Sequence, residues 1–324
     1  TTPDTMRARP VPHADGGSAA PAGAPLRPHP GQLAKLWALP YVPPMPSEAA
    51  DRVDVIVVGG GLTGLALGAA LGSAEIAVLI VERQPIPRLV ATTYDGRVTA
   101  IARGAKLLLE AIGVWPHLMP LAEPILEIVV GERGSPATVH YDHREVGGEP
   151  LGWIAENRHI REALLARLQA LPAVRLVAPA TVAELDRDGA QVRLRLAEGQ
   201  VFGAALVAAA EGKDSATRAA AGIEVRRWDY QQTGIVCTLR HAQPHRGVAL
   251  ERFFPDGPFA RLPMRGDRSS IVWALRQDRA ALVTALDDRG FLGEVAERLG
   301  DELGELSLEG PRWAFPLSLV WADR

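Results

Sequence analysis

Two apolar runs with a glycine-rich turn and a further apolar stretch between them form the clearest pattern in the chain. The run at 53–58 is β-branched and apolar on both pleat faces, which is typical of a parallel strand buried on both sides. The stretch at 62–71 predicts a helix, and the run at 77–81 predicts a second buried strand. A single transmembrane helix over 55–74 is excluded, because consecutive glycines and β-branched residues interrupt it. The pattern therefore predicts a strand–turn–helix–strand unit.

The turn of this unit, GGGLTG from residue 59, has the form G-x-G-x-x-G. Gly59 allows the tight turn, Gly61 lets the backbone approach a pyrophosphate, and Gly64 allows close packing of helix on strand. The amides of Leu62 and Thr63 lie at the positive end of the helix, where an anion binds. Because the turn lies between two predicted strands, it indicates a dinucleotide site.

Two charged residues extend this prediction. Glu82 follows the second strand at the distance where an acid accepts hydrogen bonds from the ribose hydroxyls of adenosine and repels a 2′-phosphate. Arg97 follows in YDGRVTAI, and two interpretations stay open for it. It is either a surface charge in a loop or a cation that faces the phosphates or ribityl chain of a dinucleotide.

The remaining pattern mixes helices and strands and becomes β-rich after residue 226. Helices are predicted at 104–112, 157–171 and 289–299. Strands are predicted at 125–130, 137–141, 174–177, 181–186, 191–196, 206–210, 234–239, 248–254, 259–263, 270–275 and 312–320. Asn157 is predicted to be the N-cap of its helix. Glu211 and Gly212 begin a second strand-to-helix turn, whose alternative interpretation is a capped helix start.

Composition limits the classes of function. The chain has 324 residues, a net charge of −3 and one cysteine, Cys237. This charge provides no global basic field, so no nucleic-acid partner is expected. One cysteine excludes an internal disulfide, and its apolar neighbours favour an inert strand residue. The Pro-, Ala- and Gly-rich residues 1–50 predict a disordered leader with a short helix at 32–38.

No metal site is predicted. His140 and His143 lack further ligands, and His241 and His245 have helical spacing in a stretch that Pro244 and strands exclude from a helix.

Several longer motifs specify a family. They are GGGLTGLALGAAL, DGRVTAIARGAKLLLEAIGVW, ENRHIREALLARL, AEGKDSATRAAAGI, WDYQQTGIVC, ALERFFPDGPFARLPM and SSIVWAL. With them the chain, from residue 51 to its C-terminus, resembles the ubiquinone-biosynthesis hydroxylases of the p-hydroxybenzoate-hydroxylase superfamily, which are FAD-dependent aromatic monooxygenases. The resemblance implies an α/β fold, with a Rossmann-like FAD-binding domain interleaved with an α+β substrate domain built on a mostly antiparallel β-sheet.

The resemblance also implies domain boundaries. They are a leader at 1–50, FAD-binding segments at 51–122 and 153–224, a substrate-domain hairpin at 123–152, the substrate-domain sheet at 225–314, and the start of a return to the FAD domain at 315–324. In the family, a Gly-Asp-Ala-Ala-His segment follows such a last strand. The chain stops at Arg324 before this segment, so we expect a fragment truncated ahead of that motif.

The cofactor-binding positions implied by the resemblance come from both FAD-binding segments. They are Gly59, Gly61, Leu62, Thr63 and Gly64 at the pyrophosphate, Glu82 and Arg83 at the adenosine, Arg97 at the pyrophosphate or ribityl chain, Asn157 near the ribityl chain, Val182 beside the adenine, and Glu211 and Gly212 at the family's Asp-Gly motif. Glu211 stands where the family usually has aspartate. No catalytic residue is assigned.

The activity implied is hydroxylation of the ring of a polyprenyl-phenol intermediate of ubiquinone biosynthesis through a flavin C4a-hydroperoxide. FAD is the cofactor, NAD(P)H a transient co-substrate and O2 the oxidant, so the cofactor carries the difficult chemistry. The alternatives are an FAD-dependent dehydrogenase or prenyl reductase and a truncated, non-catalytic scaffold subunit. The expected location is the cytoplasm, with peripheral contact with the inner membrane or a ubiquinone-biosynthesis complex left open.

Overall fold

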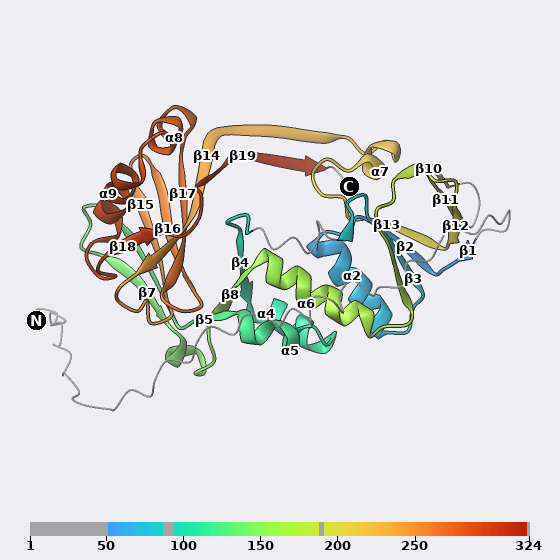
Figure 1. Cartoon of the computed structure of the whole chain (residues 1–324), viewed down its shortest axis with the longest axis horizontal. Helices are drawn as coiled ribbons and strands as arrows, with labels where there is room; N and C mark the ends of the chain where they lie inside the picture. Colours follow the sequence, from blue (N-terminus) through green and yellow to red (C-terminus); the bar gives the residue numbers. More distant parts are fainter. Residues whose placement is uncertain (1–50, 87–93, 188–190, 323–324) are drawn as a thin grey trace, which may run out of the picture. The chain divides into compact units, whose positions relative to one another are not determined.

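The computed structural model of the chain describes residues 51–86, 94–187 and 191–322 (Figure 1). All of them belong to one compact unit, Ala38–Arg324. The predicted leader at 1–50, its helix at 32–38 and the predicted turn at 188–189 lie outside the described residues. The division into FAD-binding and substrate domains stays a prediction.

The described helices are α2 (Leu62–Ser73), α4 (Arg103–Ala111), α5 (Trp115–Leu118), η1 (Met119–Leu121), η2 (His143–Val146), α6 (Asn157–Gln169), α7 (Ala216–Ala220), α8 (Gln277–Thr284) and α9 (Asp288–Leu299). The strands are β1 (Asp51–Arg52), β2 (Val55–Val58), β3 (Val78–Val81), β4 (Val98–Ala102), β5 (Glu123–Ile125), β6 (Glu127–Glu132), β7 (Thr138–Asp142), β8 (Gly152–Glu156), β9 (Val174–Val177), β10 (Val182–Asp186), β11 (Val192–Leu196), β12 (Val201–Ala204), β13 (Leu206–Ala209), β14 (Val225–His241), β15 (Val248–Phe254), β16 (Gly257–Met264), β17 (Arg268–Arg276), β18 (Leu306–Leu308) and β19 (Trp313–Ala322).

A four-stranded sheet in the order β13-β2-β3-β9, here called the parallel sheet, contains the two apolar runs of the opening unit. Every residue of β2 and β3 is buried, which confirms both predicted strands. The predicted helix at 62–71 is α2, and the one at 157–171 is α6, whose predicted apolar face is buried. Because the strands are parallel, their carboxyl ends meet at one edge, where the glycine turn lies.

Two smaller sheets adjoin this unit. The mixed sheet has the order β1-β12-β11-β10, and the three-stranded sheet has the order β4-β8-β5. The predicted strands at 181–186 and 191–196 are confirmed as the antiparallel pair β10 and β11. Strand β12 was not predicted. Its four residues read VFGA, and a glycine in so short a run weakens the strand pattern.

The large sheet has eight strands, in the order β18-β14-β17-β16-β15-β6-β7 with β19 paired to β14. Its pairs are antiparallel except β15 with β6, so the mostly antiparallel sheet implied by the family is confirmed. Helices α8 and α9 lie beside it (Figure 1), and its apolar core includes Phe259, Trp273 and Phe291.

Two predicted strands differ from the observed ones. The strand predicted at 234–239 is part of β14, which has 17 residues because β17, β18 and β19 all pair with it. The strand predicted at 125–130 is split, since Ile125 ends β5 and pairs with β8, while β6 forms the predicted hairpin with β7. Helix α8 was not predicted.

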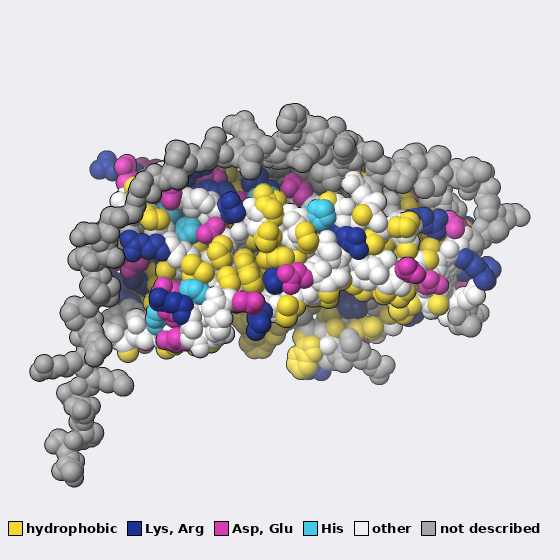
Figure 2. Space-filling model, turned by 90° about the horizontal axis from the view of Figure 1, so that it is seen from below, with side chains coloured by type: hydrophobic (Ala, Val, Ile, Leu, Met, Phe, Trp, Pro, Cys, Tyr) yellow, Lys and Arg dark blue, Asp and Glu magenta, His cyan; other side chains and the backbone are white. Residues whose placement is uncertain are grey.

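Helix α4 confirms the helix predicted at 104–112, but none of its residues is buried. Leu107 and Leu108 are 51% and 55% exposed, and Met119 is 56% exposed. Figure 2 shows, from below, hydrophobic side chains gathered on the face to which α4 and α5 belong. Among the described residues, no helix is long and apolar enough to cross a membrane.

Candidate cofactor site

The glycine turn joins β2 to α2 at the edge where β3 and β13 also end. The Gly59 amide donates to the Val81 carbonyl at 2.8 Å, and the Ala210 amide donates to the Val58 carbonyl at 2.7 Å. Neighbouring strands therefore hold the turn from both sides.

Two glycines of the turn leave no room for a side chain. A Cβ on Gly64 would lie 1.9 Å from the Gly59 carbonyl oxygen. A Cβ on Gly59, whose φ is +109°, would lie 2.6 Å from the Ala210 carbonyl oxygen. Only glycine adopts this φ readily and permits these approaches. The structure thus has the tight turn and the close helix–strand approach that the motif predicts, and contact with a cofactor stays a prediction.

The start of α2 is open where the motif predicts a phosphate. Gly61 is the N-cap, with an extended backbone, and no side chain caps the helix. A Cβ on Gly61 would meet no atom within 4 Å. The first amides of an α-helix have no intrahelical acceptor, and the helix dipole favours an anion beside them. The pyrophosphate of FAD therefore fits this end of α2, with the amides of Leu62 and Thr63 as donors.

Glu82 is buried directly after β3 and is 8% exposed. Its Oε2 accepts a hydrogen bond from the Gly60 amide at 2.6 Å, and its Oε1 accepts one from the Gln84 amide at 2.7 Å. Each carboxylate oxygen keeps a second lone pair, which can accept from a ribose hydroxyl. Gly60, which was not predicted to have a role, also leaves little room for a side chain, because a Cβ there would lie 2.8 Å from the Glu82 Cβ. In the sequence, the run of three consecutive glycines from Gly59 was the signal that could have indicated this constraint at Gly60.

A second pair of predicted residues, Arg97 and Asn157, comes from the loop before β4 and the start of α6. The Arg97 side chain is 52% exposed and donates from Nε to Asp95 Oδ2 at 2.8 Å. The Asn157 backbone amide donates to the Arg97 carbonyl at 3.1 Å, and the Thr99 hydroxyl donates to Asn157 Oδ1 at 2.6 Å. The N-cap prediction for Asn157 is wrong, because Glu156 is the N-cap of α6 and the Asn157 side chain is engaged by Thr99.

Arg161 links the two groups electrostatically and was not predicted. It lies one turn after Asn157 on α6, and its charge interacts with Asp95, Arg97 and Glu82. Burial lowers the pKa of Arg161. Burial acts to raise the pKa of Asp95, but the hydrogen bonds from Arg97 outweigh it and lower that pKa. The i, i+4 relation of Arg161 to Asn157 is the sequence signal that could have found it.

Glu211 and Gly212 follow β13 beside the turn. Glu211 Oε2 accepts hydrogen bonds from the Ser215 hydroxyl at 2.6 Å and the Thr217 amide at 3.1 Å, and Ser215 is the N-cap of α7. The capped helix start, one of the two alternatives, is therefore observed. Gly212 has a φ of +84°, and a Cβ there would meet no atom within 4 Å. A role for either residue in cofactor binding stays a prediction.

Arg83 and Val182 lie near Glu82. Arg83 is exposed, while the Ala180 amide donates to the Glu82 carbonyl at 2.8 Å and so places the start of β10 beside it. Val182 packs against the apolar cluster that includes Ile56, Leu79 and Phe202. The adenosine-side roles of both residues stay predictions.

The remaining candidate groups lie in the large sheet and in the loop that joins β14 to β15. His241 and His245 have ring centroids 5.7 Å apart, with His241 Nδ1 2.7 Å from the Gln243 carbonyl and His245 Nε2 2.8 Å from the Met264 carbonyl. Within the described ranges, no group of three or more metal-ligating side chains occurs. Cys237 is fully buried in β14, and burial raises its pKa to about 12, in agreement with an inert strand residue.

Known proteins resemble the chain in sequence. The family described as FAD binding domain matches residues 52–310. Ubiquinone hydroxylase UbiL of Rhodospirillum rubrum is 44% identical over 277 residues, which are 85% of this chain and 64% of that protein. The 3-demethoxyubiquinol 3-hydroxylase of Escherichia coli is 30% identical over 267 residues, 82% of this chain and 68% of that protein. The mitochondrial ubiquinone biosynthesis monooxygenase COQ6 of Homo sapiens is 31% identical, covering 75% of this chain and 55% of that protein.

Solved structures share the fold. Pseudomonas aeruginosa PqsL, as a mutant, matches with a TM-score of 0.69 at 20% identity, over 80% of this chain and 74% of that chain. The flavin-dependent monooxygenase PieE, solved with FAD and substrate, matches with a TM-score of 0.64 at 16% identity, over 85% of this chain and 52% of that chain. The chain thus spans between about half and two thirds of the relatives reported above from R. rubrum, E. coli and human. The chain belongs to the FAD binding domain family, as a relative of proteins named ubiquinone hydroxylase, 3-demethoxyubiquinol 3-hydroxylase and ubiquinone biosynthesis monooxygenase.

Proposed function

We propose that the protein is an FAD-dependent monooxygenase that hydroxylates the ring of a polyprenyl phenol in ubiquinone biosynthesis, with NAD(P)H and O2 as co-substrates. The observation that carries the proposal is the 44% identity to ubiquinone hydroxylase UbiL over 277 residues. The open, glycine-built start of α2 supports it, because its donors match the pyrophosphate of FAD.

FAD, when bound, supplies the redox and oxygen chemistry. The residues of the chain bind and orient it. The amides at the start of α2 hold the pyrophosphate, and Glu82 accepts from the adenosine ribose. Asn157 lies near the ribityl chain, and Arg97, which is held to it through the backbone, faces the pyrophosphate or the ribityl chain. No described side chain is assigned an acid or base role, since the proposed reaction places the chemistry on the cofactor.

The full-length protein tests this function. It is incubated with FAD, NADH or NADPH, and a polyprenyl phenol under isotopically labelled dioxygen, and the product is analysed by mass spectrometry. We expect substrate-dependent NAD(P)H oxidation and a ring that carries one labelled oxygen atom. Turnover that persists without oxygen would instead indicate a dehydrogenase or reductase and would contradict the proposal.

We also infer cytoplasmic location with peripheral contact at the inner membrane. A polyprenyl substrate resides in the bilayer, and α4 presents exposed Leu107 and Leu108 beside the charged residues Arg103, Lys106 and Glu110 of the same helix. Sedimentation with vesicles of phosphatidylglycerol tests this contact, which is wrong if the protein stays in the supernatant. From the same family resemblance, we also propose that the protein associates with other ubiquinone-biosynthesis proteins.

A further inference from the structure

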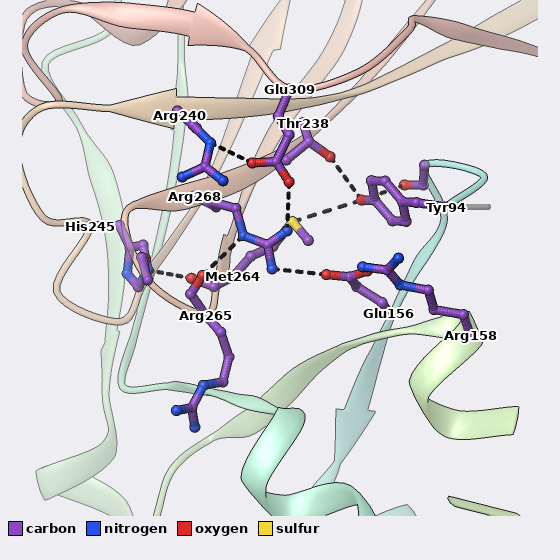
Figure 3. A network of polar contacts seen from close by, with 12 residues as sticks. Tyr94, Glu156, Arg158, Thr238, Arg240, His245, Met264, Arg265, Arg268 and Glu309 are labelled. Carbon is purple, nitrogen blue, oxygen red and sulfur yellow. Dashed lines mark hydrogen bonds and ion pairs between the residues drawn. The ribbon is translucent and has the colours of Figure 1, made fainter. Parts of the chain in front are cut away.

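Two polar anchors join the segments that carry Arg97 and Asn157 to the large sheet (Figure 3). The first is Tyr94, three positions before Arg97. Its hydroxyl accepts a hydrogen bond from Thr238 on β14 at 2.8 Å, and its ring meets Trp313 of β19 edge-on, with centroids 5.5 Å apart. This anchor holds the loop that leads into β4.

The second anchor is Arg268, the first residue of β17. One terminal nitrogen of its guanidinium donates to Glu156 Oε1 at 2.9 Å, and the other donates to Glu309 Oε1 at 2.9 Å. Its Nε donates to the Arg265 carbonyl at 3.1 Å. All three guanidinium nitrogens are therefore engaged, and Figure 3 shows the side chain between the two carboxylates.

Glu156 lies directly beside a predicted residue of the candidate cofactor site. It is the last residue of β8, the N-cap of α6 and the direct neighbour of Asn157. Within the three-stranded sheet it pairs with Val98, which lies between Arg97 and Thr99, and the Thr99 hydroxyl donates to Asn157 Oδ1. A displacement of Glu156 would therefore shift the backbone of Asn157 and strain the contact of its side chain with Thr99.

The burial of this pair argues against a role in stability alone. The Glu156 side chain is 4% exposed and that of Arg268 is 16% exposed. Removing two charges from water costs about as much as their attraction returns, whereas the forked guanidinium fixes its partners in one geometry. A pair of apolar side chains at positions 156 and 268 would fill the same space, but it would not hold position 156 in one geometry. Arg158, which pairs with the Glu156 Oε2 at 2.6 Å, lies on α6 itself and cannot tie it to the large sheet.

We propose that Arg268 is a positioning residue of the cofactor site, which ties Glu156 to the large sheet and thereby places Asn157 against the ribityl chain. This role rests on the proposed function, because it names what the large sheet contributes to the FAD site. The large sheet, which would line the substrate side, is thus connected to the Asn157 segment, which would orient the flavin. The contact joins residues 112 positions apart in the sequence.

The test uses the full-length protein with the double variant Arg268→Met, Glu156→Gln, which removes the tie without leaving a buried, unpaired charge. The matched control is Arg240→Met, since Arg240 pairs with Glu309 at 2.6 Å but is 63% exposed and does not contact Glu156. Two quantities are measured, namely FAD affinity by flavin fluorescence and amide hydrogen exchange over residues 153–160 without FAD.

We expect the double variant to bind FAD about tenfold more weakly, the order expected for a binding group displaced by a fraction of an ångström. Exchange over 153–160 becomes faster, and the control changes neither quantity. Unchanged affinity, or weaker binding with unchanged exchange, overturns the positioning role. If the double variant does not fold, Arg268→Lys carries the test, because it keeps the charge but loses the fork; it should then show the same changes at smaller size, and wild-type behaviour overturns the role.

The proposed function fails in a different way. If the wild-type protein does not bind FAD, the flavin proposal is wrong, while the exchange measurement still decides whether Arg268 holds the Asn157 segment. If the wild type binds FAD and the double variant binds equally well, only the inference about Arg268 fails.

Discussion

The parallel sheet and the large sheet differ in what they bury. Beside the parallel sheet, the core cluster consists of apolar side chains such as Ile56 and Leu79, and the glycine turn at its edge, where the pyrophosphate is predicted, is built from backbone and glycines. The large sheet buries Arg261 and Arg298, which are 2% and 5% exposed. The Arg298 guanidinium lies 4.0 Å from the Trp273 ring centroid.

This difference has a physical consequence. A site made of backbone amides depends on where the chain can turn, which glycines decide locally. A core with buried cations depends on partners from distant parts of the chain, because each charge needs an aromatic face or a carboxylate to offset its desolvation. Substitutions of the turn glycines should therefore act on ligand binding, with a loss of stability as well where the new side chain clashes with the backbone, whereas substitutions of the cations buried in the large sheet's core should act mainly on stability.

The largest expected effect comes from Gly64→Ala at the parallel sheet. The new Cβ would lie 1.9 Å from the Gly59 carbonyl oxygen, so the turn must open. We expect loss of FAD binding and a decrease in the free energy of unfolding of about 4 kcal/mol, at the upper end for single substitutions. Flavin fluorescence and urea unfolding measure the two quantities.

The matched variant Gly61→Ala separates the two effects. Its Cβ would meet no atom within 4 Å, so the free energy of unfolding should change by less than about 0.5 kcal/mol. FAD affinity should nevertheless fall, because the methyl group occupies the space through which a phosphate approaches. Equal FAD affinity of Gly61→Ala and wild type would place the pyrophosphate elsewhere.

Arg298→Met tests the large sheet. The substitution removes the contact with the Trp273 ring and the ion pairs with Asp256 and Glu294, both at 3.0 Å. The two carboxylates are 34% and 29% exposed and can regain water, so the expected loss is about 2 kcal/mol, close to a desolvated cation–π contact. Urea unfolding measures it.

The exposed pair Arg276 and Asp278 supplies the control for this variant, with side chains 77% and 70% exposed. Arg276→Met should cost less than about 1 kcal/mol. If both arginine variants lose the same free energy of unfolding, the buried Arg298 contributes no more stability than an exposed arginine. The contrast between the two sheets then disappears.

Apart from the control variants, the smallest expected effect on stability lies where the two regions meet. Tyr94→Phe removes the acceptor of the fully buried Thr238 hydroxyl, at a cost of about 1 kcal/mol at neutral pH. Burial raises the pKa of Tyr94 from 10.0 to about 12. The folded state thus holds this proton more tightly than the unfolded state, and the associated stability, complete below pH 10.0, is lost as the pH rises towards about 12.

Unfolding experiments across this alkaline range check the sign. The free energy of unfolding of Tyr94→Phe should fall less steeply than that of the wild type between pH 10.0 and about 12. Parallel curves would show that the Tyr94 hydroxyl titrates as it does in water.

The sequence by itself determined the local elements and the turn. The length and spacing of the apolar residues predicted β2, β3, α2 and α6. Each of these elements buries a whole strand or one helix face, and that pattern is visible in residues close together in the sequence. The requirement for glycine at Gly59 and Gly64 could be inferred for the same reason, since the motif reflects backbone geometry. The location of Glu82 at the end of β3 follows from its place in the chain.

Only the tertiary structure decided the rest. The 17 residues of β14 form one strand because β17, β18 and β19 supply partners that lie far along the chain. The Asn157 side chain contacts Thr99 instead of capping α6, because strand pairing brings β4 beside β8. Arg298 is buried and Arg268 reaches Glu156 for a related reason. From the sequence alone, a charged side chain is expected to be exposed. Only folding places carboxylates and aromatic rings beside it, and these contacts let it be buried.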